Sequence, residues 1–531
     1  MYNNTMKKIF NIAGPCFSKK HYMLPASDRL STILPLIDDE QFFVIHAARQ
    51  SGKTTLLLDL VNKLNESGNY YALYCSLETV QGINDAEKGI PAIWYTLEQA
   101  ISYSVILKDK YFSGKDNLEN TSNILQKSLT DLCASLDKPL IIFFDEADCL
   151  ADSTLISFLR QLRSGYVNRG TIPFIHSLAL VGMRDIRDYK AHIRNGRETL
   201  GSASPFNIVT KSLTLRNFNR EEITSLLYQH TKLTGQIFIK EVTDSIYYYT
   251  QGQPWLVNAI AREIVVEMLN NNNSLTIKTE YVEQAVNTII LRRDVHIDSL
   301  LERLKEERVR KVIEPIIMGE EKTFEKLSDD YQYVLDLGLI REDRGNVEPS
   351  NPIYGEVILR TLSYNSQEAL KMEFYPYKIP RYLQDGKIHM NYLLKDFQDF
   401  WRENSEIWSE LYQYKEAAPH LILQAFLQRV INGRGKILRE MAAGKRRLDL
   451  CVIYESYKYP IELKVCGGPR GRSRDKVQTE GIEQISRYMD LLGCREGWLV
   501  IFDRDEDLSW DEKIYSQKKI LEDKTVYVLG G

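Results

Sequence analysis

The chain has 531 residues, with 68 lysines and arginines against 72 aspartates and glutamates, and 44% of its residues are hydrophobic. This balance is typical of a globular protein and excludes a disordered, fibrous or polybasic chain, although it leaves room for a local basic patch that binds nucleic acid. At roughly 100–200 residues per domain, the length predicts about three domains.

The apolar runs and the cysteines of the sequence bear on membrane insertion and secretion. The longest strongly apolar run, residues 140–144, falls far short of the roughly 18 residues that a membrane span needs. The apolar stretch at residues 9–13 is too short for a signal peptide. The 7 cysteines show neither a CxxC pair nor metal-ligand spacing. We therefore expect a cytoplasmic protein with reduced thiols and no membrane association.

Strand and helix patterns alternate over roughly the first 200 residues. Apolar runs predict strands at 41–46, 70–77, 140–144 and 177–183, and helical periodicity predicts helices at 55–64, 90–106 and 153–162. Strands separated by helices pair in parallel, and ligands bind beyond the carboxyl ends of such strands. Because Lys53, Asp145, Glu146 and Arg184 all fall at these ends, we expect them to share one site.

The strongest motif lies between the first strand and its helix. Residues 47–54 follow a phosphate-binding pattern, in which backbone N–H groups and a helix N-terminus cradle a phosphate. Lys53 would reach the β- and γ-phosphates, Thr54 would give a hydroxyl to Mg²⁺, and Gly52 would let the backbone approach closely. Ala47 replaces the usual first glycine, which suits a position of negative φ. The nucleotide ligands predicted from this loop are Ala47, Ala48, Arg49, Gln50, Ser51, Gly52, Lys53, Thr54 and Thr55.

Asp145 and Glu146 complete this predicted site. A carboxylate that ends a buried strand needs a partner, because an unpaired buried charge is costly. Mg²⁺ is such a partner, so we expect Asp145 to hold Mg²⁺ together with Thr54. Glu146 is placed to orient and deprotonate an attacking water. Residues 145–148 spell Asp-Glu-Ala-Asp, but no other helicase motif accompanies them, so a helicase is weakly supported.

These motifs resemble the P-loop ATPases of the additional-strand class with a catalytic glutamate, within the AAA-like and STAND-like ATPases of prokaryotes. The resemblance covers residues 10–360 and implies a parallel sheet, a helical lid and a winged helix. It implies that Arg184 senses the γ-phosphate, with Arg187 as a neighbouring candidate, and that Pro254 of the Gly-Gln-Pro at 252–254 lies near the adenine. The winged helix would serve as a packing module, with DNA binding as the less favoured alternative.

A second constellation lies in the last third of the chain. After a predicted linker at 364–391, helices are expected at 396–412, 419–431 and 481–492, and strands at 447–454, 459–465, 497–502 and 525–529. Strand alternation puts Glu462 and Lys464 on one face, and Asp449 on the paired strand can meet Glu462 around a divalent ion. Such a metal can activate water, while Lys464 positions or deprotonates that water or neutralises developing charge.

The pattern resembles the PD-(D/E)XK nuclease superfamily over residues 416–531. Gln484 and Tyr488 resemble the QxxxY motif of its RecB-like members and would support the site. The resemblance implies Mg²⁺ or Mn²⁺ held by Asp449 and Glu462, and DNA as the substrate.

One departure from that superfamily bears on activity. Many members add a glutamate on the first core helix, where residues 419–431 offer only Gln424 and Gln428. Glu440 is the remaining acidic substitute, if its strand pairs nearby, so a degenerate site stays open.

Basic residues surround this second site in the sequence. They are Lys445, Arg446 and Arg447 before Asp449, and Arg470, Arg472, Arg474 and Lys476 in a predicted loop at 467–476. Such a loop suits a nucleic-acid backbone with little base specificity, and a solvated charged loop is an equal alternative.

We therefore expect an α/β fold with five parts: an ATPase core at 1–218, a lid at 219–300, a winged-helix-like part at 301–365, a helical linker at 366–415 and a nuclease-like domain at 416–531. The expected function is an ATPase, using ATP and Mg²⁺, coupled to a metal-dependent DNA nuclease-like domain. A nucleotide-controlled switch or scaffold with a degenerate nuclease fold, and a DNA motor, are the alternatives. A homo-oligomer is compatible with the sequence, but no trans-acting arginine finger argues for a ring.

Overall fold

The computed structural model describes most of the chain. The described residues are 8–25, 29, 32–110, 122–183, 209–292, 294–317, 328–343, 345–358, 361, 382–384, 386–411, 423–424, 426–427, 435–443, 446–467, 473–503, 505 and 507–531. The chain divides into two compact units, Met1–Val312 with Thr323–Gly355 and Ile313–Lys322 with Glu356–Gly531. None of the helices in these described segments is long and apolar enough to cross a membrane.

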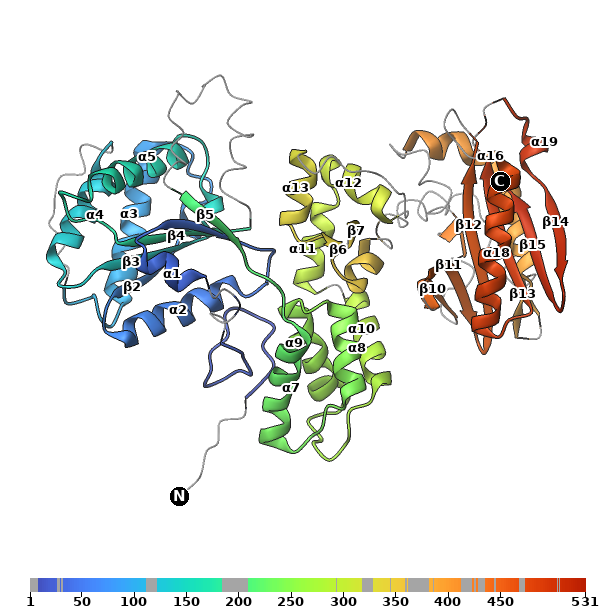
Figure 1. The fold of residues 1–531 in the computed structure, drawn as a ribbon, viewed down its shortest axis with the longest axis horizontal. Helices are drawn as coiled ribbons and strands as arrows, with labels where there is room; N and C mark the ends of the chain where they lie inside the picture. Colours follow the sequence, from blue (N-terminus) through green and yellow to red (C-terminus); the bar gives the residue numbers. More distant parts are fainter. Residues whose placement is uncertain are drawn as a thin grey trace. The chain divides into compact units, whose positions relative to one another are not determined.

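The first unit contains a five-stranded sheet in the order β2-β3-β4-β1-β5, and every neighbouring pair is parallel (Figure 1). The strands are β1 (Phe42–His46), β2 (Tyr71–Ser76), β3 (Leu140–Asp145), β4 (Ser177–Gly182) and β5 (Val209–Thr214). The parallel α/β core is thus confirmed, and β4 lies between β1 and β3, as the additional-strand resemblance implies. The strand β5 was not predicted, because this edge strand is mostly polar and gives no apolar run.

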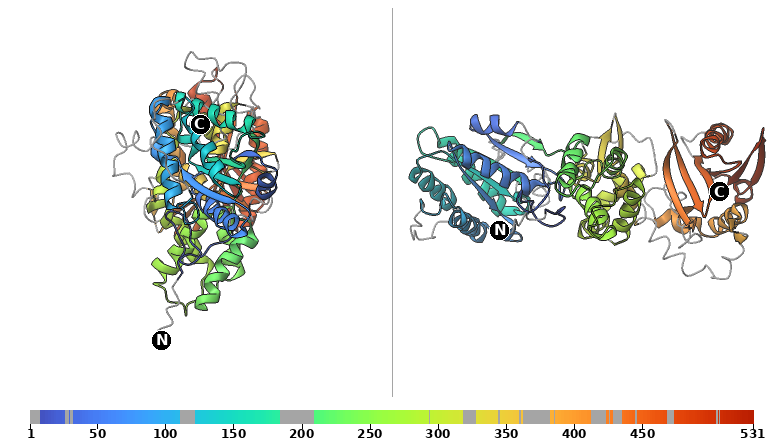
Figure 2. Two further views of the ribbon diagram at one scale, coloured as in Figure 1. Left: turned by 90° about the vertical axis from the view of Figure 1, so that its left-hand side faces the viewer. Right: turned by 90° about the horizontal axis from the view of Figure 1, so that it is seen from below.

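Helices cover both faces of this sheet (Figures 1 and 2). One face packs against α1 (Ile33–Asp38) and α2 (Lys53–Ser67), the other against α3 (Ala86–Tyr103), α4 (Ile124–Ser135) and α5 (Asp152–Asn168). Alternate residues of each strand point to opposite faces of the sheet: Phe43 packs towards α2, and Phe42 packs towards α5. Strands buried on both faces are apolar throughout, which is why the sequence showed continuous runs rather than alternation.

A helical lid follows the sheet. It comprises α7 (Arg220–Thr234), α8 (Lys240–Thr250), α9 (Pro254–Arg262), η6 (Glu263–Met268) and α10 (Thr279–Arg292). Asn219 and Glu222 form a reciprocal capping box at the start of α7, and Pro254 occupies the first turn of α9, where a missing N–H costs nothing. The helix α9 passes into a wider π-turn at Glu263, whose buried carboxylate pairs with Arg292 at 2.8 Å.

After the lid come the helices α11 (Val295–Arg303), α12 (Glu307–Ile317) and α13 (Asp329–Asp336), a hairpin of β6 (Ile340–Asp343) and β7 (Asn346–Pro349), and a further helical stretch at residues 352–358. The hairpin lies within residues 301–365, where the resemblance implied a winged helix. Buried Tyr331 and Val334 of α13 hold this helix on the hairpin, with Tyr331 donating a hydrogen bond to Glu342 at 2.7 Å.

The second unit is built on a six-stranded mixed sheet in the order β10-β11-β12-β13-β15-β14. Its elements are a small hairpin of β8 (Leu383–Gln384) and β9 (Lys387–Ile388), then α16 (Met390–Leu411), β10 (Gly435–Ala443), β11 (Arg446–Tyr454), β12 (Tyr457–Cys466), α18 (Arg474–Leu492), β13 (Glu496–Asp503), α19 (Trp510–Lys513), β14 (Ser516–Leu521) and β15 (Lys524–Gly530). The strands β10, β11 and β12 are antiparallel, and β12, β13 and β15 are parallel.

Helices lie on both faces of this second sheet. The helix α18 packs through Val477, Ile485 and Met489 on the face that carries Leu499 and Ile501 of β13. From α16, Phe397 and Trp401 contact Phe502, which strand alternation places on the other face.

Several sequence predictions for the second unit are wrong in their boundaries. The linker predicted at 364–391 contains the β8–β9 hairpin, and α16 begins at Met390 rather than 396 because Met390, Leu393 and Leu394 bury one face of its first turns. The helix predicted from 481 begins at Arg474, so residues 474–476 are not part of a loop. The strands β10 and β14 were not predicted, because their residues alternate with charges at the ends of the sheet.

Two glycines of the lid share a positive φ but differ in the space around them. Both have positive φ, 76° at Gly252 and 78° at Gly235, but an added Cβ at Gly252 would lie 1.8 Å from the Phe218 carbonyl oxygen, whereas nothing lies within 4 Å at Gly235. We expect Gly235→Ala to lower the free energy of unfolding by about 1 kcal/mol through backbone strain alone. Gly252→Ala should cost roughly 2 kcal/mol more, because the backbone must move. Denaturant unfolding of the two variants checks this, and equal losses would contradict it.

Candidate functional site

The loop between β1 and α2 has the geometry of a phosphate cradle. Gln50 and Gly52 have φ of 58° and 91°, and the turn brings the N-terminus of α2 to the mouth of a cavity. The first N–H groups of a helix have no partner within it, so they are free to bind an anion. Ala47 is not among the residues with positive φ, which confirms that alanine is tolerated there.

The carbonyl groups of this loop accept hydrogen bonds from side chains. Arg29 Nη1 donates to Ser51 O at 2.9 Å, and Gln253 Nε2 donates to Gln50 O at 3.3 Å. Lys53 Nζ donates to Ala47 O at 2.8 Å and to Ala48 O at 3.1 Å. These contacts occupy carbonyl groups of the loop, while the N–H groups in the first turn of α2 have no acceptor within the helix.

Arg29 is a contact of the phosphate loop that was not predicted from the sequence. Its guanidinium is buried, also donates to Arg216 O at 2.9 Å, and lies over the ring of Phe218 at 5.0 Å. Burial lowers its pKa to about 10, so it keeps its charge at neutral pH. A lone arginine before the first strand carries no motif that could have identified it.

Lys53 is itself buried, with 7% of its surface exposed. Burial lowers the pKa of Lys53, and the nearby carboxylates of Glu146, Asp145 and Asp148 oppose that shift. The ammonium therefore lies between the loop and a group of acids, where a phosphate can replace its carbonyl partners.

Asp145 ends β3 and is 1% exposed. Its Oδ2 accepts hydrogen bonds from Thr54 Oγ1 at 2.8 Å and from Tyr74 OH at 3.1 Å, and its Oδ1 accepts one from Glu146 N at 3.0 Å. The structure thus brings together Lys53, Thr54 and Asp145 as the sequence predicted.

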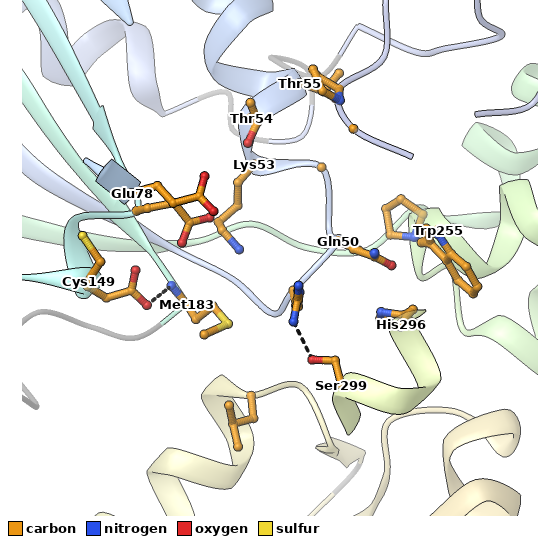
Figure 3. A pocket seen from close by; sticks show the side chains of 18 of the residues that line it. Gln50, Lys53, Thr54, Thr55, Glu78, Cys149, Met183, Trp255, His296 and Ser299 are labelled. Carbon is orange, nitrogen blue, oxygen red and sulfur yellow. Dashed lines mark hydrogen bonds between the residues drawn. The ribbon is translucent and has the colours of Figure 1, made fainter. Parts of the chain in front are cut away.

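Glu146 follows Asp145 in the left-handed conformation, with φ of 55°, and lines the same cavity. Burial raises the pKa of Glu146, as do the charges of Asp148 and Asp145, while Lys53 lowers it. Asp148 accepts a hydrogen bond from Met183 N at 3.0 Å and so ties this segment to the end of β4 (Figure 3). Arg184 and Arg187 lie outside the described residues, so their sensing role stays a prediction.

The cavity has a volume of about 670 Å³ and is walled by several parts of the first unit. Figure 3 shows Lys53 and Thr54 at its centre, Glu78 and Met183 on one side, and Trp255 and His296 on the other. Of the other predicted ligands, Arg49, Gln50, Gly52, Thr55 and Pro254 also line it, whereas Ala47, Ala48, Ser51 and Asp145 are not among its lining residues. The N-terminal segment joins the wall at Cys16, whose N–H donates to Thr55 Oγ1 at 3.0 Å.

The lid forms one end of the cavity. Gln253 caps α9 by accepting from Leu256 N at 2.6 Å, while its amide nitrogen reaches the phosphate loop. Trp255 Nε1 donates to Ile12 O at 2.8 Å, which joins the lid to the N-terminal segment. Pro254 and Trp255 both line the cavity, and the place of Pro254 near the adenine stays a prediction.

The helix α11 closes another side. Ser299 accepts a hydrogen bond from Arg49 Nη1 at 2.7 Å, and His296 packs on Trp255 with ring centroids 4.8 Å apart (Figure 3). Burial, with the charge of Arg49, lowers the pKa of His296 to about 4, so the ring is neutral at pH 7. These contacts join distant segments and left no sequence signal.

The donor set fits Mg²⁺ bound with a nucleotide. The described part of the chain has no group of three or more His, Cys, Asp or Glu residues that could hold a metal alone. Mg²⁺ usually takes one or two protein oxygens and completes its shell with phosphate and water, which matches Thr54 and Asp145.

The second unit contains the other predicted constellation. Asp449 follows the register Leu450↔Ile461 and so lies beside Glu462, and its Oδ2 accepts a hydrogen bond from Leu463 N at 2.8 Å. Lys464 Nζ donates to Glu462 Oε1 at 2.5 Å, which confirms that these two share a face.

Glu462 is 1% exposed, and its Oε2 has no hydrogen-bond partner among the residues that the structure describes. Burial, with the charge of Asp449, raises its pKa from 4.5 to about 7, while Lys464 opposes that shift. Two carboxylates with one bare buried oxygen fit a divalent cation.

The supporting residues of this second site are placed in part. Glu462 pairs with Leu499, which packs on α18, so Gln484 and Tyr488 belong to the helix that covers the same face. Tyr488 is buried in that core and Gln484 is half-buried. Gln424 is buried, whereas Gln428 and the side chain of Glu440 lie outside the described residues.

The basic patch is only partly supported. Arg474 lies in the first turn of α18 and pairs with Asp503 at 2.7 Å, so its assignment to a free basic loop is wrong. Lys476 is exposed. Arg470, Arg472, Lys445 and the side chains of Arg446 and Arg447 lie outside the described residues.

Comparison with known proteins identifies the first unit. The chain belongs to the AAA-like domain family, whose model matches residues 37–359. Among solved structures it is similar to a Walker-type ATPase of Pyrococcus abyssi, with 13% identity, a TM-score of 0.47 and coverage of 66% of this chain and 99% of that chain. The ORC2 protein of Aeropyrum pernix (13% identity, TM-score 0.34, 67% and 99% coverage) and the RuvB branch migration motor of Thermotoga maritima (12%, 0.33, 66% and 95%) are also similar. No curated protein matches.

The raised pKa of Glu462 predicts a pH dependence of stability. Between its ordinary value of 4.5 and about 7, the folded protein binds this proton more tightly than the unfolded chain does. Stability should therefore fall as pH rises through this window, by an amount on the order of 1–3 kcal/mol. Glu462→Gln should remove that fall, whereas Glu455→Gln, at an exposed turn of the same hairpin, should keep it. Unfolding of the three proteins at pH 4.5 to 8 measures this, and identical profiles would contradict it.

Proposed function

We propose that this protein binds ATP with Mg²⁺ in the cavity of the first unit and hydrolyses it. The observation that carries this proposal is the contact of Thr54 with Asp145 at 2.8 Å, made beside the buried Lys53 and Glu146. A helix N-terminus, a lysine, a hydroxyl and two acids around one cavity are what phosphoryl transfer to water requires. Membership of the AAA-like family supports the same activity.

The residues divide the work by chemistry. The free N–H groups of the loop and the Lys53 ammonium bind the phosphates, and Thr54 and Asp145 would hold Mg²⁺. Bound Mg²⁺ would neutralise charge on the phosphate oxygens. Glu146 lines the cavity with a raised pKa, which suits a base that orients water and takes its proton. Arg184 as the γ-phosphate sensor is kept as part of the proposal.

The walls of the cavity suit the rest of the nucleotide. Pro254 and Trp255 of the lid, with the N-terminal segment near Ile12, offer an apolar end for the base. Because Arg49 bonds to Ser299 of α11, a nucleotide that moves the loop would also move α11. Such coupling requires different affinities of ATP for two arrangements.

We also propose that the second unit acts as a metal-dependent nuclease-like domain on DNA. Asp449, Glu462 and Lys464 adjoin one another on β11 and β12, and the bare Glu462 Oε2 needs a cation or a proton. Antiparallel strands followed by a helix and parallel strands support the PD-(D/E)XK resemblance, with Mg²⁺ or Mn²⁺ as the metal.

A switch or scaffold is the second candidate function. The observation in its favour is that the described part of 419–431 offers buried Gln424 but no carboxylate, which leaves the metal two acidic ligands. In that case the second unit binds a partner or nucleic acid without cleaving it.

The five-part division and the location stay proposals. The winged-helix part would act mainly in packing, since α11 contacts Arg49 of the phosphate loop through Ser299 and α13 approaches His46 of β1 through Asp336. All 7 cysteines are free thiols, which supports the cytoplasm.

Two variants of the first unit test ATP hydrolysis. Glu146→Gln should keep ATP affinity within about twofold and lower kcat at least 100-fold, because it removes only the base. Lys53→Ala should lose ATP binding. Glu78→Gln, an exposed acid of the same cavity, is the matched control and should hydrolyse ATP like the wild type. Nucleotide titration and phosphate release measure both steps, and wild-type protein that binds no ATP would overturn the proposal.

The nuclease proposal has a separate test on the full chain. Wild-type protein should cleave linear or supercoiled DNA with Mg²⁺ or Mn²⁺, with and without ATP. Glu462→Ala should lower the rate at least 100-fold, because the metal loses a buried ligand. Glu455→Ala should leave it unchanged. If wild-type protein cleaves nothing with either metal, or Glu462→Ala cleaves normally, the switch or scaffold becomes the better account.

A further inference from the structure

Tyr74 is a residue near the nucleotide site to which no motif assigns a role. It lies on β2, next to β3, with Phe143 as its partner in the register, while Asp145 pairs with Ser76. Its hydroxyl donates a hydrogen bond to Asp145 Oδ2 at 3.1 Å, and Thr54 donates to the same oxygen at 2.8 Å. Two donors, one from α2 and one from β2, therefore hold one carboxylate oxygen.

The hydrogen bonds to the Asp145 carboxylate leave one acceptor position open. A carboxylate offers about four acceptor positions, two on each oxygen. Thr54 and Tyr74 use both positions of Oδ2, and Glu146 N uses one position of Oδ1. The remaining acceptor position lies on Oδ1, so this oxygen is the one available to a water bound to Mg²⁺.

We propose that Tyr74 is a positioning residue of the magnesium site, which holds Asp145 so that Oδ1 accepts from metal-bound water. The inference rests on the proposed binding of ATP with Mg²⁺. It adds that the neighbouring strand, and not only the two predicted metal ligands, sets how well the site binds the metal. Groups that orient a metal ligand commonly change metal affinity or activity about 10–100-fold when removed.

The same strand contains its own control. Tyr71 also donates its hydroxyl to a carboxylate, Asp137 Oδ1 at 2.8 Å, and its register partner Leu140 begins β3, at the opposite end from Asp145. Tyr71→Phe and Tyr74→Phe each remove one phenol–carboxylate hydrogen bond from one strand. Only the second bond involves a predicted metal ligand.

The experiment compares nucleotide and metal binding in full-length wild type, Tyr74→Phe and Tyr71→Phe. We expect Tyr74→Phe to bind ATP in EDTA within about twofold of the wild type. The Mg²⁺ concentration that gives half of the metal-dependent gain in ATP affinity should rise about tenfold. Mn²⁺ binding in the presence of ADP, followed by electron paramagnetic resonance, should weaken by a similar factor. Tyr71→Phe should match the wild type in all three measurements.

Three results would overturn the inference. Tyr74→Phe could match Tyr71→Phe in metal dependence, could lose ATP affinity equally with and without metal, or could unfold while Tyr71→Phe does not. The last two would assign Tyr74 to the fold alone. Tyr74→Met, which keeps a long apolar side chain without a hydroxyl, repeats the comparison and must show the same tenfold shift. Wild-type protein without metal-dependent nucleotide binding would instead defeat the proposed function itself.

Discussion

The buried carboxylate of Asp145 is the constraint on which the first unit depends. A charge that is 1% exposed is tolerated only with donors around it, and here they come from three different elements: Thr54 of α2, Tyr74 of β2 and the backbone N–H of Glu146. In the sheet, β4 separates β3 from β1. The contact of Thr54 with Asp145 therefore joins the helix that follows β1 to β3, a strand that is not the neighbour of β1, and it holds the first turn of α2 at the carboxyl edge of the sheet.

In the phosphate loop, carbonyl groups accept hydrogen bonds from side chains of the protein. Arg29, Gln253 and Lys53 bind carbonyl oxygens of the loop from three directions. The N–H groups in the first turn of α2 have no acceptor within the helix, and they favour an anion at this end of the loop. Because Gln253 belongs to the lid, the same hydrogen bonds that shape the loop also connect it to the lid. The loop and the lid are therefore joined directly by the hydrogen bond between Gln253 and Gln50.

The parts of the two sites that could be predicted from the sequence are those that depend on consecutive residues or on strand alternation. The loop at 47–54, Asp145 with Glu146, and the pair Glu462 with Lys464 are of this kind. Arg29, Tyr74 and Ser299 could not be found, because they reach the site from distant segments and act through single hydrogen bonds that impose no spacing. The starts of α16 and α18 were misplaced for a related reason: burial of Met390 and Val477, rather than a capping signal, extends those helices.

The two buried acids, Asp145 and Glu462, differ in a way that bears on function. Asp145 has three hydrogen-bond donors, so its charge is stabilised before any metal binds. Glu462 has Lys464 on one oxygen, while the other is buried without a partner in the described residues. Burial, with the charge of Asp449, raises the pKa of Glu462 against the opposing effect of Lys464. An incompletely satisfied buried carboxylate is costly to the fold, and either a proton or a divalent cation relieves that cost. A cation bound as proposed would therefore stabilise the Glu462 carboxylate more than the Asp145 carboxylate, whose hydrogen bonds are already made.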